Sequence, residues 1–370
     1  MMTMPGFLSV LILITCFFSD IASAKQLIGV MFGSYGDIDD VNTELRPFIR
    51  NTLTDPDILP LPAWLRATIA DAGWYIERRN IRAQYKTIGG RTNSRRLSQD
   101  QARLVAEILG NRGHDARSYV GFTMTTPFVA EALDSAQEDG IETLYVIYQG
   151  AQYAKDTAQI LFRHVQEYLK KHPSWQVKVV GIRSFSDDHR FASLLARNIE
   201  RRLQKDFSEY SDDDICLFLT AHGNVLRRSK ESDEYLIQVT RIIQNVKERF
   251  NNLDVSYGFH NHDEIPGIPW SQPSNAKAMQ NLAQKPCQAV LVNGQISFTI
   301  DNLETLYNQV VEIPALLNKE TERLKVKTKK IVVDGVFNND PEFAHFMADL
   351  VEEAAQGEGD LINLNSSPNQ

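Results

Sequence analysis

The chain has 370 residues, with 47 acidic and 39 basic side chains and a net charge of −8 at neutral pH. This negative balance argues against nucleic acid as the main partner, because a phosphate backbone selects basic surfaces. The length is sufficient for two compact domains with sizeable cores. No run after residue 24 is long and apolar enough to cross a bilayer, so we expect no transmembrane span in the mature chain.

The first 24 residues have the pattern of a secretory signal peptide. Residues 7–18 are almost entirely apolar, a run too short to span a bilayer comfortably. The sequence ASA at residues 22–24 is a typical cleavage site. We therefore expect cleavage after Ala24 and export to the periplasm or out of the cell. The alternative is an apolar N-terminal helix retained on a cytoplasmic protein, because no Lys or Arg precedes the apolar run.

Strand-like and helical patterns alternate along the mature chain. Buried strands are predicted at residues 27–32, 118–122, 144–148, 177–182, 215–223, 255–259, 289–292 and 331–333. Helices are predicted at residues 99–109, 192–204, 235–250 and 341–355. This alternation predicts an α/β fold with parallel sheets and right-handed crossovers, present in two copies. We expect an N-terminal domain over residues 25–187, a C-terminal domain over 188–356 and a disordered polar tail over 357–370.

The mature chain retains two cysteines, Cys216 and Cys287. Two cysteines make neither a disulfide framework nor a four-thiolate cluster. Since Cys216 lies inside an apolar strand, we expect it to serve as a buried packing residue.

The strand predicted at residues 215–223 ends in His222 and Gly223. The carboxyl edge of an open α/β sheet is where ligands and catalytic groups are usually found. His222 is therefore a candidate functional residue, although an ordinary core histidine would give the same local pattern.

Two blocks of sequence resemble the signatures of the ferrochelatase family. The first is FLTAHG at residues 218–223, followed by Asp233 and Tyr235, and the second is FTIDNLETLY at residues 298–307. Further stretches that match the family in order lie at residues 53–56, 85–90, 119–122, 151–153, 269–270 and 338–343. The resemblance implies two Rossmann-like domains with a porphyrin cleft between them, and insertion of Fe²⁺ into a porphyrin for haem biosynthesis. It also implies that His222 and Glu304 face each other across the macrocycle as the catalytic and metal-contacting residues.

Three further residues are predicted to bind the porphyrin. Tyr35 follows the first strand and is a candidate for stacking on the ring, although it is equally well explained as a loop aromatic. Tyr235 belongs to the first signature, and Thr123 stands where the family usually has an arginine. Losing that arginine removes a partner for a porphyrin carboxylate.

Other departures from the family are Asn224-Val225 in place of Leu-Pro, and Asn308 in place of an acidic residue. Some members carry an iron–sulfur cluster near the C-terminus. Residues 357–370 contain no cysteine, so we expect no such cluster.

The chemistry of the two main residues fits the implied reaction. An imidazole accepts a proton or ligates a metal near neutral pH, and a carboxylate on the opposite face carries protons away or holds a cation in transit. Without the resemblance, Glu304 is explained as an exposed carboxylate at a helix start.

His260 and His262 follow the strand at residues 255–259 and form either an accessory metal site on the iron's route or a polar loop. Two functional hypotheses remain open. One is an exported ferrochelatase, with porphyrin and ferrous iron as its partners. The other is a non-catalytic exported descendant that binds porphyrin, haem or metal. The sequence does not predict an oligomeric state.

Overall fold

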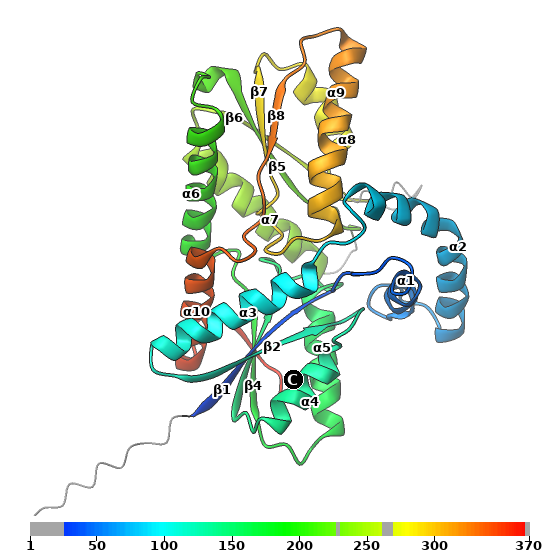
Figure 1. The fold of residues 1–370 in the computed structure, drawn as a ribbon, viewed down its shortest axis with the longest axis vertical. Coiled ribbons are helices and arrows are strands. Elements are labelled where there is room, and N and C mark those ends of the chain that lie inside the picture. The colour runs from blue at the N-terminus through cyan, green and yellow to red at the C-terminus, as the bar shows by residue number, and fades with distance from the viewer. Residues whose placement is uncertain (1–25, 227–229, 261–268, 367–370) are drawn as a thin grey trace, which may run out of the picture.

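The computed structural model describes residues 26–226, 230–260 and 269–366, and the strands form two separate sheets (Figure 1). The first sheet has the order β2-β1-β3-β4-β9. Its members are β1 (Leu27–Ser34), β2 (Asp115–Phe122), β3 (Thr143–Tyr148), β4 (Lys178–Ser184) and β9 (Asp360–Asn363). All its pairs are parallel except β4 with β9.

The second sheet has the order β6-β5-β7-β8, with all pairs parallel. It contains β5 (Ile215–His222), β6 (Asp254–His260), β7 (Ala289–Asn293) and β8 (Lys330–Val333). Strand β5 is central and buried over all but its last residue, as expected of an almost continuous apolar run. The α/β class and the eight parallel strands predicted from sequence are therefore confirmed.

Helices flank both sheets. Those that belong to the first sheet are α1 (Leu45–Thr54), α2 (Ala63–Thr87), α3 (Ser94–Asn111), α4 (Val129–Glu138), α5 (Ala158–Lys171) and α10 (Pro341–Gln356). Those around the second sheet are α6 (His189–Asp206), α7 (Lys230–Arg249), α8 (Asn275–Ala283) and α9 (Ile313–Leu324), with a 3₁₀ turn at Asp212–Asp214. A π-helix, η2 (Glu304–Glu312), runs directly into α9. Among the described residues, no helix is long and apolar enough to cross a membrane.

The C-terminal part of the chain corrects two expectations. We assigned residues up to 356 to the second domain, but α10 packs against α3 of the first, and Figure 1 shows the two helices side by side. We expected a disordered tail from residue 357, but β9 pairs with β4 at the edge of the first sheet. Leu361 packs against one core cluster of that sheet, whereas Ile362 packs against the cluster on the other face, to which Leu364 belongs. This alternation lets a short segment bury apolar side chains on both faces of the sheet.

A shared core joins the two halves of the molecule. One buried cluster includes Val30 and Phe32 of the first sheet together with Leu217 and Leu219 of the second. The aromatic rings between the sheets make edge-on or stacked contacts with one another, and they come from Phe185, Phe191, Phe337, Phe343 and Phe346. The sheets are therefore fixed against each other by packing as well as by the chain connections.

The two cysteines of the mature chain form a disulfide, Cys216–Cys287. Cys216 is buried, as predicted, but the prediction that it serves only as a packing residue is wrong. Strand β5 lies next to β7, and Cys287 stands two residues before β7, so the two Cα atoms come within 5.8 Å. That separation is typical of disulfides. The predicted signal peptide, residues 1–24, lies outside the described residues.

Candidate functional site

Two histidines occupy the carboxyl ends of adjacent strands. His222 ends β5 and His260 ends β6, and the two are paired in the ladder. The side chain of His222 is 36% exposed, whereas that of His260 is completely buried. Gly223 then passes so close to β6 that a Cβ on it would lie 2.7 Å from the carbonyl oxygen of His260. A glycine is therefore required after His222.

Glu304, the first residue of the π-helix, contacts both histidines. Its Oε1 lies 3.5 Å from His222 Nε2, and its Oε2 lies 2.9 Å from His260 Nε2. The structure thus brings together the two residues that the signatures single out. It differs from the implied arrangement in one respect, because a macrocycle does not fit between two atoms that are 3.5 Å apart. For the two residues to face opposite sides of a ring, the Glu304 side chain has to turn away from His222.

The neighbours of His222 fix its orientation and its tautomer. Its Nδ1 lies 3.3 Å from Asn224 Oδ1, and because an amide oxygen only accepts, Nδ1 carries the hydrogen. The other ring nitrogen, Nε2, is the one directed at Glu304 Oε1. The buried hydroxyl of Tyr235 donates to the backbone carbonyl of His222 over 2.9 Å. Tyr235 therefore holds the end of β5 in place.

Three tyrosines lie within electrostatic range of the Glu304 carboxylate. The pKa values of Tyr35, Tyr148 and Tyr235 are all raised, mainly by burial and then by the negative charges of Asp156 and Glu304. Their hydroxyls consequently stay protonated and serve as hydrogen-bond donors across the physiological pH range. Tyr148 and Asp156 were missed in the sequence, although Tyr148 ends β3 at the same kind of strand edge as His222.

Tyr35 and Thr123, the other two predicted binding residues, differ in burial and in contacts. Tyr35 is half-buried, and its ring meets that of Phe48 edge-on with the centroids 6.4 Å apart. Thr123 is 4% exposed, and its amide and hydroxyl both donate to the carbonyl of Ser34. Because the Thr123 side chain is committed to the backbone, it does not replace the charge of an arginine.

The first domain also holds the start of the π-helix. Asp37, in the loop after β1, accepts a hydrogen bond of 2.8 Å from the backbone amide of Leu303. It also accepts from the amide of Ile38 and the hydroxyl of Tyr85. Burial raises the pKa of Asp37 to about 6, against the opposing effect of these hydrogen bonds. Glu304 is thus positioned from the first domain as well as the second.

No group of three or more His, Cys, Asp or Glu side chains is arranged to hold a metal ion in the part of the chain that the structure describes. His260 is engaged by Glu304 and by Thr220, whose Oγ1 lies 3.1 Å from His260 Nδ1. His262, the other half of the predicted accessory site, lies outside the described residues. That site therefore stays a prediction.

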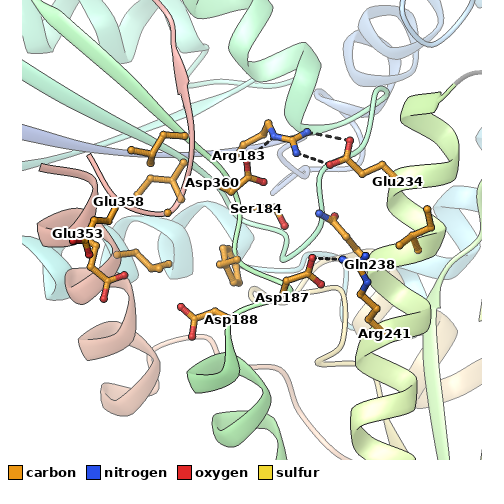
Figure 2. A pocket seen from close by; sticks show the side chains of 16 residues that line it. Arg183, Ser184, Asp187, Asp188, Glu234, Gln238, Arg241, Glu353, Glu358 and Asp360 are labelled. Atoms are coloured by element: carbon orange, nitrogen blue, oxygen red, sulfur yellow. Dashed lines mark hydrogen bonds and ion pairs between the residues drawn. The ribbon is translucent and has the colours of Figure 1, made fainter. Parts of the chain in front are cut away.

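A separate cavity of 700 Å³ lies between β4, β9, α7 and α10, and its lining does not include His222, His260 or Glu304 (Figure 2). Arg183 of β4 binds Glu234 of α7 over 2.5 and 3.0 Å and Asp360 of β9 over 2.9 Å. Arg241 binds Asp187 over 2.6 Å. These pairs bind α7 to the first domain. Glu234 directly precedes Tyr235, whose hydroxyl binds the carbonyl of His222.

Two Rossmann-like α/β domains, each built on a mostly parallel sheet, give the molecule the fold of the chelatases. The sirohydrochlorin chelatase SirB of Bacillus subtilis, solved with Fe³⁺, aligns over 90% of this chain and 99% of its own with a TM-score of 0.53 at 10% identity. At that identity the likeness concerns the fold alone.

The sequence model of the ferrochelatase family matches residues 27–355, and the chain belongs to that family. A ferrochelatase of Cyanothece sp. is 27% identical over 339 residues, which cover 89% of this chain and 83% of the relative. A ferrochelatase of Geotalea daltonii is 28% identical over 321 residues, or 85% of this chain and 94% of the relative. The family assigns the chain to the metal chelatases of haem biosynthesis.

Proposed function

We propose that this protein inserts ferrous iron into a porphyrin, with His222 and Glu304 as the reacting side chains. Family membership supports the class of reaction. The observation that carries the assignment is that His222 Nε2 and Glu304 Oε1 lie 3.5 Å apart at the carboxyl end of β5. A base and a carboxylate thus stand within reach of one reacting centre.

Insertion exchanges two pyrrole protons of the macrocycle for one Fe²⁺, so the site has to take up two protons for each metal ion. His222 Nε2 accepts one, as the lone pair of a neutral imidazole can. Glu304 accepts the other, or holds the iron in transit, from the opposite face of the ring. The raised pKa values of Tyr35, Tyr148 and Tyr235 keep their hydroxyls protonated, so these groups do not compete for the pyrrole protons.

Anaerobic incubation of the mature chain with Fe²⁺ and a porphyrin, followed by absorbance, tests this function. The proposal expects the free-base spectrum to convert to that of the metalloporphyrin at a rate proportional to enzyme concentration. Absence of conversion at every pH tested would refute it.

The second hypothesis is an exported protein that binds porphyrin, haem or metal without catalysing insertion. Thr123 favours it, because no arginine charge is available at that position for a porphyrin carboxylate. This hypothesis expects no insertion by the unmutated protein. It also expects a tight haem complex that His222→Ala weakens by removing an axial ligand.

We also propose that the protein acts outside the cytoplasm. The apolar leader ending at residues 22–24 supports export, and so does the Cys216–Cys287 disulfide, because such bonds persist in oxidising compartments. N-terminal sequencing of the natural protein should begin at Lys25. A chain that begins at Met1 and carries two free thiols after residue 24 would contradict export.

A further inference from the structure

The ring of His260 is held on every side. Its side chain is completely buried at the end of β6. The ring stacks on Phe298 with centroids 5.5 Å apart and an interplanar angle of 27°. It meets the ring of His222 nearly at right angles, with centroids 5.8 Å apart. A ring packed in this way presents each nitrogen in one fixed direction.

Both nitrogens of His260 have hydrogen-bond partners that together form a chain. Asn275 Nδ2 lies 3.1 Å from Thr220 Oγ1, which lies 3.1 Å from His260 Nδ1. At the other side of the ring, His260 Nε2 lies 2.9 Å from Glu304 Oε2. All three members behind Glu304 are buried, so water does not substitute for any of these bonds.

The direction of donation along this chain follows from the hydrogens available. Asn275 Nδ2 donates to Thr220 Oγ1, whose own hydrogen has two acceptors in reach, His260 Nδ1 at 3.1 Å and Asn275 Oδ1 at 3.3 Å. Because the ionised carboxylate of Glu304 only accepts, His260 Nε2 has to donate to it, and Nδ1 therefore accepts from Thr220. The hydrogen of the neutral imidazole is then on Nε2 and points at the carboxylate of Glu304. The reverse order would place a lone pair of Nε2 against the carboxylate oxygen, which is unfavourable in a buried site.

We propose that His260 is a positioning residue, which holds Glu304 Oε2 through Nε2–H in a tautomer fixed by Thr220 and Asn275. The other carboxylate oxygen, Oε1, is thereby left facing His222 and the reacting centre. The role in turnover rests on the proposed function, whereas the tautomer is a property of the folded protein that is measured without substrate.

Kinetics of iron insertion test the positioning role. His260→Ala removes the Nε2–H donor that orients the Glu304 carboxylate, so kcat should fall about 100-fold while KM for the porphyrin changes little. His260→Gln carries an amide that can donate from the place of Nε2, and it should restore at least about tenfold of the loss. His189→Ala is the matched control, because the side chain of His189 is 91% exposed, and it should leave kcat unchanged. Equal rates for the His260→Ala and His260→Gln variants, with both chains folded, would overturn the role.

Nitrogen-15 spectra of histidine-labelled protein test the tautomer independently of turnover. The resonances missing from His260→Gln identify His260, and Nε2 should show the shift of a protonated nitrogen and Nδ1 that of an unprotonated one. Thr220→Val removes the donor to Nδ1 and should mix the two tautomers, whereas Thr220→Ser should preserve the original one. A hydrogen on Nδ1 in the unmutated protein would overturn the proposal. If the unmutated protein inserts no iron, the proposed function fails while these spectra still decide the tautomer.

Discussion

The Cys216–Cys287 disulfide leads to a quantitative prediction about stability. The bond joins residues 71 positions apart, and the loop that it closes contains α7, β6 and α8. For a loop of this length, the chain-entropy estimate of the stabilisation is about 4 kcal/mol at room temperature. Replacing both cysteines by alanine should therefore lower the free energy of unfolding by up to about that amount, because the unfolded chain gains the freedom of the open loop.

Urea or guanidinium unfolding of the chain from Lys25 onwards measures this effect, and that chain has only the two cysteines. Reduced unmutated protein is the control that retains both sulfur atoms in the core, and it should unfold at the same lower midpoint as the double variant. A reductant should shift the midpoint of the unmutated protein and leave that of the double variant unchanged. Two titratable thiols in the folded, unreduced protein, or equal midpoints with and without reductant, would refute the reasoning.

Three further substitutions test how the site is held. Tyr235→Phe removes the hydroxyl that donates to the His222 carbonyl, and should lower kcat by about tenfold with porphyrin affinity retained, as single-turnover assays would show. Asn224→Ala releases Nδ1 of His222 and should lower kcat for insertion by a similar factor of about ten, whereas a value equal to that of the unmutated protein would mean that the tautomer of His222 is set elsewhere. The carboxyl of Asp37 has its pKa raised to about 6, so its ionised form destabilises the folded state. Stability should therefore rise by about 1 kcal/mol from this group as pH falls from 7 to 5, in the window below the folded pKa, and Asp37→Asn should remove that rise in unfolding curves at the two pH values.

The strands and the position of His222 could be predicted because their signals are local. The apolar run of β5 identifies a buried strand without knowledge of its neighbours, and the histidine that ends it falls at the sheet edge by the topology of parallel sheets. Glu304 was recognised by resemblance to the family, since its own sequence environment is that of any helix start.

The features that were missed depend on which distant segments become neighbours. The disulfide requires that β5 lie beside β7, and the return of α10 to the first domain requires the shared aromatic core. His260 was noticed only as one of two histidines that follow a strand. Its contact with Glu304 depends on the pairing of β5 with β6 and on the π-helix. Neither feature can be recognised from the spacing of apolar residues in the sequence.

The most direct test of the central claim compares iron insertion and porphyrin binding in the unmutated protein, in His222→Ala and in Glu304→Gln. The account predicts insertion by the unmutated chain and none by His222→Ala. It also predicts a strong reduction in Glu304→Gln and similar porphyrin affinity in all three, because the altered groups act on the centre of the ring. Insertion by His222→Ala at the unmutated rate would contradict the account.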